Sequence, residues 1–251
     1  MEERYDDRMN IALILSGGTG RRMGLNMPKQ YIEVGGRPII SYVLERLLSH
    51  GEIDAVQIVA EEEWRDLIEG AINVLDTVES IDGAEPGALL RKKFRGFSRP
   101  GENRQLSILH GLEDIREYAS EEDYVLIHDA ARPLLSAEQI TDCLDAAGEH
   151  DGAIPVLMMK DTVYSSTDGL TITSLLNRSQ IYAGQAPEVF RLGVYYEANK
   201  RLLPDAILRI NGSTEPAVMA GMDIAMIPGD EGNFKITTRA DLERFRRKVS
   251  E

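Results

Sequence analysis

Short apolar runs alternate with helical stripes along the first part of the chain. Residues 11–15 (IALIL) form a continuous apolar run that ends in glycines, which is typical of a strand buried on both faces. Residues 38–50 place apolar side chains three or four positions apart, which predicts an amphipathic helix with proline in its first turn. A strand at residues 54–60 and a helix at residues 61–72 repeat the unit. This alternation predicts a parallel sheet.

The alternation is interrupted once and then resumes. Residues 75–100 are polar and glycine-containing with a basic cluster, so we expect an irregular excursion or lid there. Beyond it the pattern predicts helices at residues 103–118 and 136–150, the second capped by Ser136, and strands at residues 124–128 and 153–156. The expected fold class is therefore α/β, with a doubly wound, mostly parallel, Rossmann-like sheet.

A different pattern occupies residues 157–185. Its β-branched stretches flank a turn signal at residues 166–169 (STDG), which predicts a protruding β-hairpin arm. The unpaired edges of the strands in such an arm must be covered, and exchange of the arms between the subunits of a dimer is one way to cover them. The remaining expected elements are helices at residues 191–203 and 213–222, extended segments at 223–227 and 233–236, and a final helix capped by Thr238 and Asp241. We expect one domain over residues 1–251, with the arm at about 157–185.

Composition and charge narrow the class of protein. With 43% hydrophobic and 28% charged residues, global disorder is excluded. The 28 Lys and Arg against 42 Asp and Glu give a formal net charge of −14, so nucleic acid and anionic membranes are not expected partners. A local cluster of cations can still bind a small anion, because salt screens charges beyond about 8–10 Å.

Cysteine, histidine and N-terminal composition exclude further classes. Cys143 is the one cysteine, and the four histidines have no metal-binding spacing, so an internal disulfide and a structural zinc are not expected. The first ten residues are polar, and no apolar run reaches the length of a membrane span. We expect a cytoplasmic protein.

The first chemical motif is residues 16–24 (SGGTGRRMG), followed by residues 28–30 (PKQ). Glycines after a strand let backbone N–H groups approach phosphates, and Arg21, Arg22 and Lys29 add cations, so a triphosphate would suit the segment. The P-loop pattern is absent, and the dinucleotide fingerprint lacks its third small residue. The alternative is a glycine-rich turn with solvated arginines.

The second motif is residues 128–133 (HDAARP), directly after a buried strand. A carboxylate at the carboxyl end of a parallel strand points into the crevice where such sheets bind ligands, so Asp129 is a candidate ligand for Mg²⁺ beside nucleotide phosphates. The alternative is an Asp129–Arg132 pair that tightens a turn. His128 is interpreted as a packed or hydrogen-bonded residue.

Two weaker motifs complete the set. In residues 99–107 (RPGENRQLS), groups around Gly101 and Ser107 could read the edge of a base, and Arg104 could face phosphate. In residues 232–238 (GNFKITT), Lys235 is placed on a short strand, where a solvated lysine is the alternative.

In this order, and with residues 160–163 (KDTV), 184–188 (GQAPE) and 233–242 (NFKITTRADL), the motifs resemble the 2-C-methyl-D-erythritol 4-phosphate cytidylyltransferases of isoprenoid synthesis and the related ribitol 5-phosphate cytidylyltransferases. The resemblance spans residues 11–247. It implies transfer of a cytidylyl group from CTP to a polyol phosphate with release of pyrophosphate, a requirement for Mg²⁺, and a homodimer.

The resemblance also implies roles by position. It gives Arg22, Lys29 and Lys235 as catalytic cations, Asp129 as metal ligand, Gly17, Gly18 and Gly20 at the phosphates, Gly101, Glu102 and Ser107 at cytosine, Arg132 near the polyol, and Thr162 and Arg178 on an arm that crosses to the partner's acceptor phosphate. The active site would then be shared between subunits.

Three departures concern the acceptor. The family commonly has Thr where this chain has Ala186, Gln where it has Glu188, and Asp where it has Thr214, so a hydroxyl and a carboxylate are missing from their usual positions. Residues 15–18 and 182–185 lean towards the ribitol-type relatives. We expect 2-C-methyl-D-erythritol 4-phosphate as acceptor, with ribitol 5-phosphate or another alditol phosphate as the alternative. A non-catalytic nucleotide-binding protein is a third interpretation.

Overall fold

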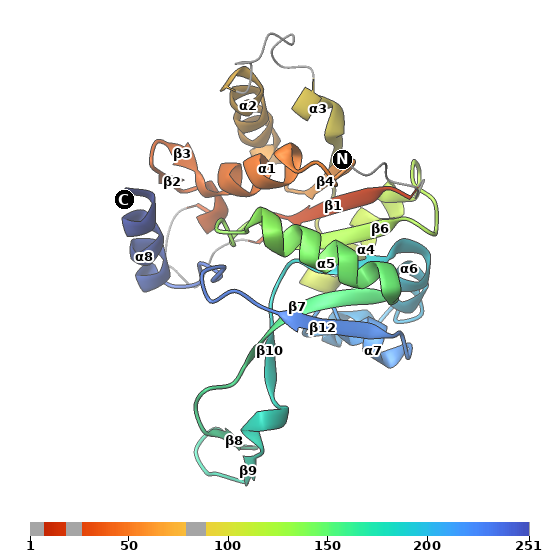
Figure 1. Ribbon diagram of the computed structural model, residues 1–251, viewed down its shortest axis with the longest axis vertical. Coiled ribbons are helices and arrows are strands. Elements are labelled where there is room, and N and C mark those ends of the chain that lie inside the picture. The colour runs from red at the N-terminus through yellow and green to blue at the C-terminus, as the bar shows by residue number, and fades with distance from the viewer. Residues whose placement is uncertain (1–7, 19–26, 79–88, 251) are drawn as a thin grey trace.

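A computed structural model describes residues 8–18, 27–78 and 89–250. In these ranges eight strands form one sheet in the order β10-β7-β11-β6-β1-β4-β5, with β12 beside β7 (Figure 1). Strand β1 runs parallel to both β4 and β6, whereas β11 runs antiparallel to β6 and β7. The strands of the sheet are β1 (Asn10–Leu15), β4 (Ala55–Val59), β5 (Phe94–Ser98), β6 (Tyr124–Asp129), β7 (Gly152–Met158), β10 (Tyr182–Gly184), β11 (Glu188–Arg191) and β12 (Ile224–Pro228).

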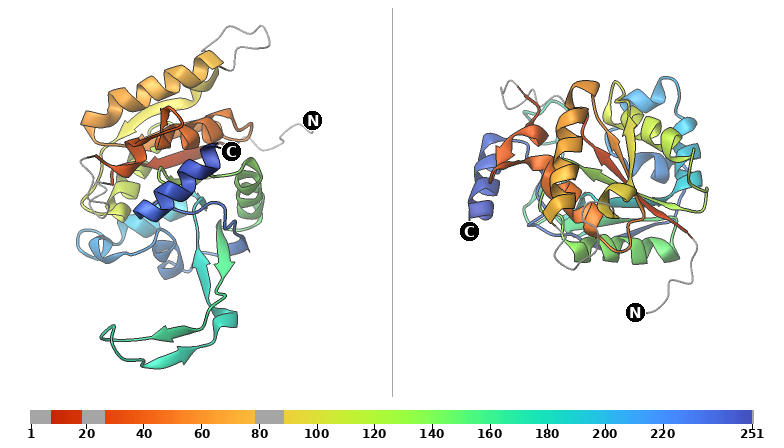
Figure 2. Two further views of the ribbon diagram at one scale, coloured as in Figure 1. Left: turned by 90° about the vertical axis from the view of Figure 1, so that its left-hand side faces the viewer. Right: turned by 90° about the horizontal axis from the view of Figure 1, so that it is seen from above.

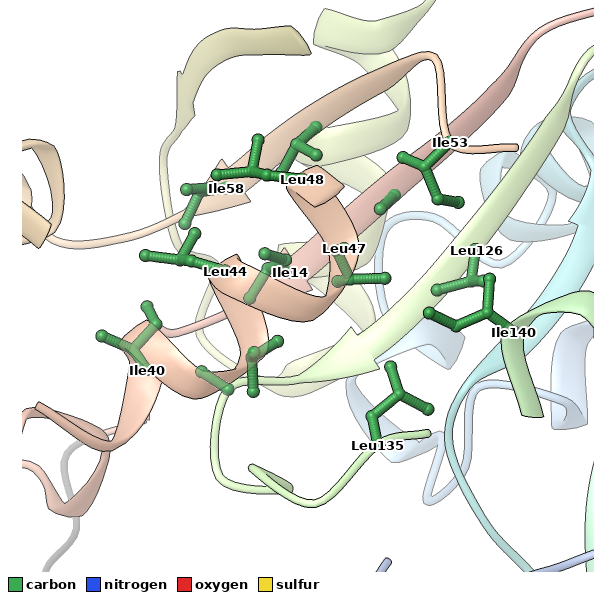
Figure 3. Packing of buried hydrophobic residues seen from close by; sticks show 14 of the residues in the cluster. Ile14, Ile40, Leu44, Leu47, Leu48, Ile53, Ile58, Leu126, Leu135 and Ile140 are labelled. Atoms are coloured by element: carbon green, nitrogen blue, oxygen red, sulfur yellow. The ribbon is translucent and has the colours of Figure 1, made fainter. Parts of the chain in front are cut away.

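Helices cover both faces of this sheet, as the continuous apolar run of β1 predicts. Ala12 and Ile14 belong to one buried cluster, which also takes side chains from α1 (Ile39–Ser49), α2 (Glu62–Val78) and α5 (Ala137–Glu149). Figure 3 shows part of this cluster, with Leu44 and Leu47 of α1 and Ile140 of α5. Ile11 and Leu13 belong to a second cluster on the opposite face, with α4 (Arg104–Ile115) and α6 (Leu192–Lys200). Each fully buried aliphatic side chain contributes about 1.5–3 kcal/mol relative to exposure, so the two clusters hold the doubly wound architecture together.

Helices α1, α4 and α5 begin and end within three residues of the predicted positions. Ser136 caps α5 by accepting a hydrogen bond from the Gln139 N–H at 3.1 Å. Across the described ranges, no helix combines the length and the apolar character that a bilayer span requires. The helices are α1 (Ile39–Ser49), α2 (Glu62–Val78), α3 (Leu89–Lys93), α4 (Arg104–Ile115), α5 (Ala137–Glu149), α6 (Leu192–Lys200), α7 (Glu215–Met219) and α8 (Arg239–Ser250), with 3-10 turns at Lys29–Tyr31, Arg178–Gln180 and Ala206–Arg209.

The C-terminal helix α8 packs beside a small hairpin made of β2 (Glu33–Val34) and β3 (Arg37–Pro38). Leu242 and Phe245 of α8 are buried in a third cluster together with Val34 and Ile236. This packing fixes the segment just before α8, which carries Lys235.

The predicted arm projects from the body of the molecule (Figures 1 and 2). Strands β7 and β10 pair antiparallel at its base, and β8 (Val163–Ser165) and β9 (Ser174–Leu176) pair antiparallel at its tip. Gly169 closes the turn with φ +71°, a conformation that favours glycine. The apolar side chain of Leu170 is 90% exposed at this tip. The hairpin prediction is confirmed.

Two local predictions are wrong. The predicted irregular excursion at residues 75–100 is replaced at both ends by regular structure, because helix α2 continues to Val78 and α3 and β5 precede residue 100. Residues 79–88 lie outside the described residues. Apolar and polar residues do not alternate regularly in the β5 sequence FRGFS. Gly96 stands in the middle of this strand with φ +124°, and the register with β4 shifts there. Residues 233–236 do not form the expected strand within the described part of the chain. A bond from the Ile236 N–H to the Ala131 carbonyl (2.8 Å) ties this loop to the neighbouring segment instead.

Candidate functional site

A pocket of about 490 Å³ opens where the parallel strands end. Segments that follow β1, β4 and β5 meet the last residue of β6 there, at the edge of the sheet where α/β folds bind ligands. Nine of the residues predicted from sequence line this pocket: Gly17, Gly18, Lys29, Gly101, Glu102, Arg104, Ser107, Asp129 and Lys235. The pocket therefore unites four motifs that are far apart in the chain.

The glycine segment after β1 is held by the residues that follow Lys29. The Gln30 side-chain amide donates to the carbonyls of Ser16 (2.7 Å) and Gly18 (2.9 Å). The hydroxyl of Tyr31 donates to the same Ser16 carbonyl at 3.0 Å. The sequence analysis gave these two side chains no role, although they directly follow Lys29 in residues 28–31 (PKQY). They shape the loop whose backbone would face a phosphate.

The predicted residues Gly20 and Arg22 lie outside the described residues, as does Arg21. Their roles stay predictions. Gly17 is described, and a Cβ added to it would lie 2.9 Å from the Cβ of Pro100. Glycine is required at this position because the first loop packs directly against the segment that begins the next motif.

That segment, residues 100–107, is ordered by a helix cap. The Asn103 side chain accepts from the Leu106 N–H at 2.8 Å at the start of α4. The hydroxyl of Ser107 accepts from the Gly101 N–H (2.9 Å) and donates to the Asn103 carbonyl (2.8 Å). Gly101 and Ser107 are therefore adjacent, as a shared role at one edge of a base requires.

Asp129 is surrounded by cations. Its carboxylate accepts from Nζ of Lys235 at 2.9 Å and from Nε of Arg104 at 3.2 Å. Nε of Arg132 lies 3.7 Å from the same carboxylate. Burial alone would raise the pKa of Asp129, but the charges of Arg104, Lys235 and Arg132 hold this pKa well below its usual range. Asp129 is thus a permanent anion with three cationic side chains around it.

Arg132 and His128 tie the turn after β6 to the Lys235 loop. Arg132 donates from Nη1 to the Asn233 carbonyl at 2.7 Å, which ties the turn to the Lys235 loop. The Asp129–Arg132 pair of the turn-tightening alternative is also present, with Nε of Arg132 3.7 Å from the Asp129 carboxylate. The pocket lining includes Ala131 but not Arg132. His128 is fully buried, donates from Nε2 to the Arg132 carbonyl (3.0 Å), and burial lowers its pKa to about 4. It is therefore neutral at pH 7, in agreement with the packed interpretation.

Sequence reasoning missed a buried carboxylate next to Arg104. Glu188, at the start of β11, accepts from the Thr214 hydroxyl at 3.0 Å. Arg104 donates to the hydroxyl of the neighbouring Ser213 at 2.6 Å. Glu188 therefore places a carboxylate within one hydrogen bond of position 214, where the family commonly has Asp. The sequence contained a signal for this site. Relative to the family pattern, position 188 gains a carboxylate and position 214 loses one.

Thr162 and Arg178 do not reach this pocket within one chain. They line a separate hollow of about 450 Å³ on the arm, together with Leu175, Leu176 and Asn177. Arg178 donates from Nη1 to the Lys160 carbonyl at 2.7 Å. The arm points away from the body of the same chain (Figure 2). These two predicted residues are brought together with each other but not with the residues of the pocket at the sheet edge.

The donor set at Asp129 suits Mg²⁺ as one ligand among several. Magnesium usually binds one or two carboxylates together with substrate phosphates and water. Among the described residues, no three His, Cys, Asp or Glu side chains gather to form a complete metal site. A metal held here would take one carboxylate oxygen from Asp129 and its other ligands from phosphates and water.

The amino-acid sequence matches a known family and known proteins over most of its length. The family model described as IspD, 2-C-methyl-D-erythritol 4-phosphate cytidylyltransferase, matches residues 10–248. A bifunctional enzyme IspD/IspF from Rhodospirillum rubrum is 36% identical over 236 residues, which cover 94% of this chain and 56% of that protein. The chain therefore spans just over half the length of this relative. A ribitol-5-phosphate cytidylyltransferase from Streptococcus pneumoniae is 32% identical over 238 residues, which cover 94% of this chain and 96% of that protein.

Solved structures agree on the fold. A 4-diphosphocytidyl-2C-methyl-D-erythritol synthase from Anaerococcus prevotii superimposes with a TM-score of 0.76 at 24% identity, covering 97% of both chains. A 2-C-methyl-D-erythritol 4-phosphate cytidylyltransferase from Francisella tularensis gives a TM-score of 0.75 at 21% identity, covering 96% of this chain and 99% of that one. At these identities the likeness establishes the α/β architecture with its arm. Together with the family match over residues 10–248, it shows that this chain belongs to the 2-C-methyl-D-erythritol 4-phosphate cytidylyltransferase family.

Proposed function

We propose that this protein transfers a cytidylyl group from CTP to a polyol phosphate and releases pyrophosphate. The observation that carries the proposal is the single pocket in which Gly18, Lys29, Gly101, Asp129 and Lys235 meet. It combines a glycine segment, two lysines and a carboxylate at the carboxyl edge of a parallel sheet. These are the groups that bind and polarise nucleotide phosphates.

The reaction needs positioning more than it needs a protein base. An oxygen of the acceptor phosphate attacks the α-phosphorus of CTP, and a new P–O bond forms. The bond from the α-phosphorus to the bridging oxygen breaks, and its electron pair leaves with pyrophosphate. A phosphate monoester has a second pKa of about 6 and is mostly dianionic at pH 7, so the nucleophile is already deprotonated. The described lining of the pocket supplies the cations Lys29, Arg104 and Lys235 for this positioning.

The chain's cations would stabilise the charge that develops. Lys29 lines the pocket beside the glycine segment, and Lys235 lines it from the loop before α8. Both are suited to hold the triphosphate in line with the acceptor. Bound through Asp129, Mg²⁺ would neutralise phosphate charge during transfer. Gly101, Glu102 and Ser107 would recognise the cytosine ring, because their segment offers backbone and hydroxyl groups at one side of the pocket.

The acceptor we propose is 2-C-methyl-D-erythritol 4-phosphate, which is named in the family's description. Ribitol 5-phosphate is the second candidate. The Streptococcus pneumoniae relative favours this acceptor, because the match covers 96% of that protein. A non-catalytic nucleotide-binding role is the third, and it is disfavoured because Lys29, Asp129 and Lys235 are all present in the pocket.

One assay separates these three candidates. Pyrophosphate release is measured with purified protein, CTP, Mg²⁺ and each acceptor at matched concentrations, with Lys29→Ala protein as the control. We expect kcat/KM for the methylerythritol phosphate to exceed that for ribitol 5-phosphate by roughly ten-fold or more. The reverse order would assign the alditol acceptor. If pyrophosphate is released with neither of the two acceptors, the enzymatic proposal is refuted.

We further propose that the protein acts as a homodimer in the cytoplasm. Tyr164, Leu170, Ile172 and Leu175 on the arm are more than half exposed, and an apolar patch of this kind favours contact with another chain. In a two-fold assembly the arm of one subunit would carry Thr162 and Arg178 to the acceptor side of its partner's pocket. The cytoplasm is proposed because CTP and a polyol phosphate are highly charged and do not cross an apolar barrier unaided.

A further inference from the structure

The loop that carries Lys235 lies between the end of β12 and the start of α8. At its beginning, the Gly229 N–H donates to the Val156 carbonyl of β7 at 2.9 Å. Beyond the lysine, the Ile236 N–H donates to the Ala131 carbonyl at 2.8 Å. The described stretch between these two contacts belongs to no helix or strand. The position of Lys235 therefore depends on what holds this stretch.

The side-chain amide of Gln185 binds both backbone groups of one residue in this stretch. Its Nε2 donates to the Asp230 carbonyl at 3.0 Å, and its Oε1 accepts from the Asp230 N–H at 3.0 Å. A glutamine amide can do both, because it offers donors and an acceptor in one plane. Gln185 is 7% exposed, so the two bonds are shielded from water. Its side chain thus pairs with Asp230 as the backbone of a neighbouring antiparallel strand would.

The backbone of Gln185 is itself fixed at the base of the arm. It directly follows β10, the strand that returns from the arm, and its N–H donates to the Pro155 carbonyl of β7 at 2.8 Å (Figure 1). The next residue adds a second tether, because the Asn233 side chain donates to the Ala186 carbonyl at 2.8 Å. Asn233 is 1% exposed and lies two positions before Lys235. Two consecutive residues at the base of the arm therefore hold the loop that carries the lysine.

We infer that Gln185 is a positioning residue for Lys235, that it acts through the backbone of Asp230, and that it keeps the lysine aligned with the nucleotide phosphates. The inference rests on the proposed function, because that function gives Lys235 a phosphate ligand. Lys235 lines the pocket and reaches Asp129 at 2.9 Å. A shift of its loop by about 1 Å would disturb this alignment, because a misplacement of that size can cost about 10²-fold in rate.

The test compares buried substitutions that differ in whether they free the loop. Gln185→Met keeps the length of the side chain and removes both bonds to Asp230. Asn233→Leu removes the second tether and leaves Gln185 in place, so it tests the same inference if the first variant does not fold. Gln57→Met is the matched control, because Gln57 is a buried glutamine of β4 that bonds the Ser98 hydroxyl of β5 at 3.0 Å instead.

We expect Gln185→Met to lower kcat about ten-fold and to change KM for CTP less than about three-fold. In a Lys235→Ala background the same substitution should lower kcat no further, because both changes act on one group. Hydrogen exchange of residues 229–236, measured by mass spectrometry without substrate, should become faster. Asn233→Leu should act in the same direction. Gln57→Met should keep kcat within about two-fold of wild type even where it lowers Tm.

The readouts separate the inference from the proposed function. If wild-type protein releases no pyrophosphate from CTP, the proposed function fails, and faster exchange of residues 229–236 in Gln185→Met would still support Gln185 as the residue that holds the Lys235 loop. If wild-type protein turns over and Gln185→Met matches its kcat, the inference is overturned. It is also overturned if exchange of the loop is unchanged, if the loss of kcat is the same with and without Lys235, or if Gln57→Met loses as much kcat.

Discussion

Lys235 donates to Asp129 over 2.9 Å although 106 positions separate the two residues. The contact joins the loop before α8 to the end of β6, and Arg104 and Arg132 face the same carboxylate. Three cations therefore surround this one carboxylate, despite the formal net charge of −14 on the whole chain. A cleft of this kind attracts anionic substrates locally, because distant surface charge is screened by salt.

The first prediction concerns the two lysines of the pocket. Lys29→Ala and Lys235→Ala should each lower kcat by about 10²–10³-fold, the typical cost of removing one electrostatic stabiliser. Their Tm values should change little, since both side chains lie at the pocket surface. Lys248→Ala, on the exposed side of α8, is the control and should keep normal turnover. Near-normal turnover of either pocket variant at saturating CTP would show that its assigned role is wrong.

The second prediction concerns Asp129. Asp129→Asn should remove most Mg²⁺-dependent turnover, because the amide keeps the shape and loses the charge. The matched control is Asp123→Asn at the opposite end of β6, where Asp123 accepts from the N–H groups of Met9 and Ser120. The control should lose stability and keep its dependence on Mg²⁺. Full activity of wild-type protein in excess chelator would contradict the metal role.

Contiguous motifs were enough to predict most of the pocket. Gly17 and Gly18 follow one strand and Asp129 ends another, and parallel strands bring their carboxyl ends to one edge of the sheet. The register of β1 with β6 places Leu15 opposite Asp129, so the two motifs meet as the alternating pattern predicts. The arm was predictable for a similar reason, because its turn signal stands between two β-branched stretches.

Contacts between distant single residues were not predictable in this way. Strand β11 lies antiparallel between β6 and β7, and no local pattern in its four residues indicates that position. The contact between Glu188 and Thr214 depends on this placement, so it became visible only in three dimensions. Strand β5 was missed because Gly96 interrupts its alternation and the tertiary pairing with β4 overrides weak local propensity.

The third prediction is a pH dependence at the start of α8. Burial alone would raise the pKa of Asp241, but hydrogen bonds from Thr237 and Thr238 lower it from 3.8 to about 2. A lowered folded-state pKa means that the carboxylate stabilises the fold above pH 4 and loses this effect as pH falls through 2. Asp241→Asn should therefore cost about 0.5–1 kcal/mol in urea unfolding at pH 7.

The difference between wild type and Asp241→Asn should shrink as the pH is lowered from 4 towards 2. Glu243→Gln, on the exposed face of the same helix, is the control and should change stability little at any of these pH values. A difference that stays constant with pH would mean that the charge of Asp241 does not cap the helix.

The fourth prediction uses Cys143 as a reporter of unfolding. The thiol is buried in α5, and burial raises its pKa to about 12. Almost no thiolate is present at pH 8, so the native protein should resist thiol-specific reagents and react once unfolded. Labelling is followed against urea concentration, and its midpoint should coincide with loss of circular dichroism. Rapid labelling without denaturant would show that the helix opens locally.

The last prediction tests whether the active site is shared between subunits. Thr162 and Arg178 line a hollow on the arm and not the nucleotide pocket of their own chain. A guanidinium binds phosphate through two parallel hydrogen bonds, which a lysine matches poorly. Arg178→Lys should therefore raise KM for the polyol phosphate and leave KM for CTP nearly unchanged. An equal rise in both values would argue against a specific acceptor contact.

Subunit mixing tests the same assignment independently. Lys29→Ala and Arg178→Ala proteins should each be nearly inactive alone. In a mixed dimer, one of the two sites combines the intact Lys29 of one subunit with the intact Arg178 of the other, so activity should reappear as subunits exchange. Exchange is followed separately with two fluorescent labels. If the labels mix and no activity returns, Arg178 does not act on its partner's site, and the arm has to be assigned to assembly alone.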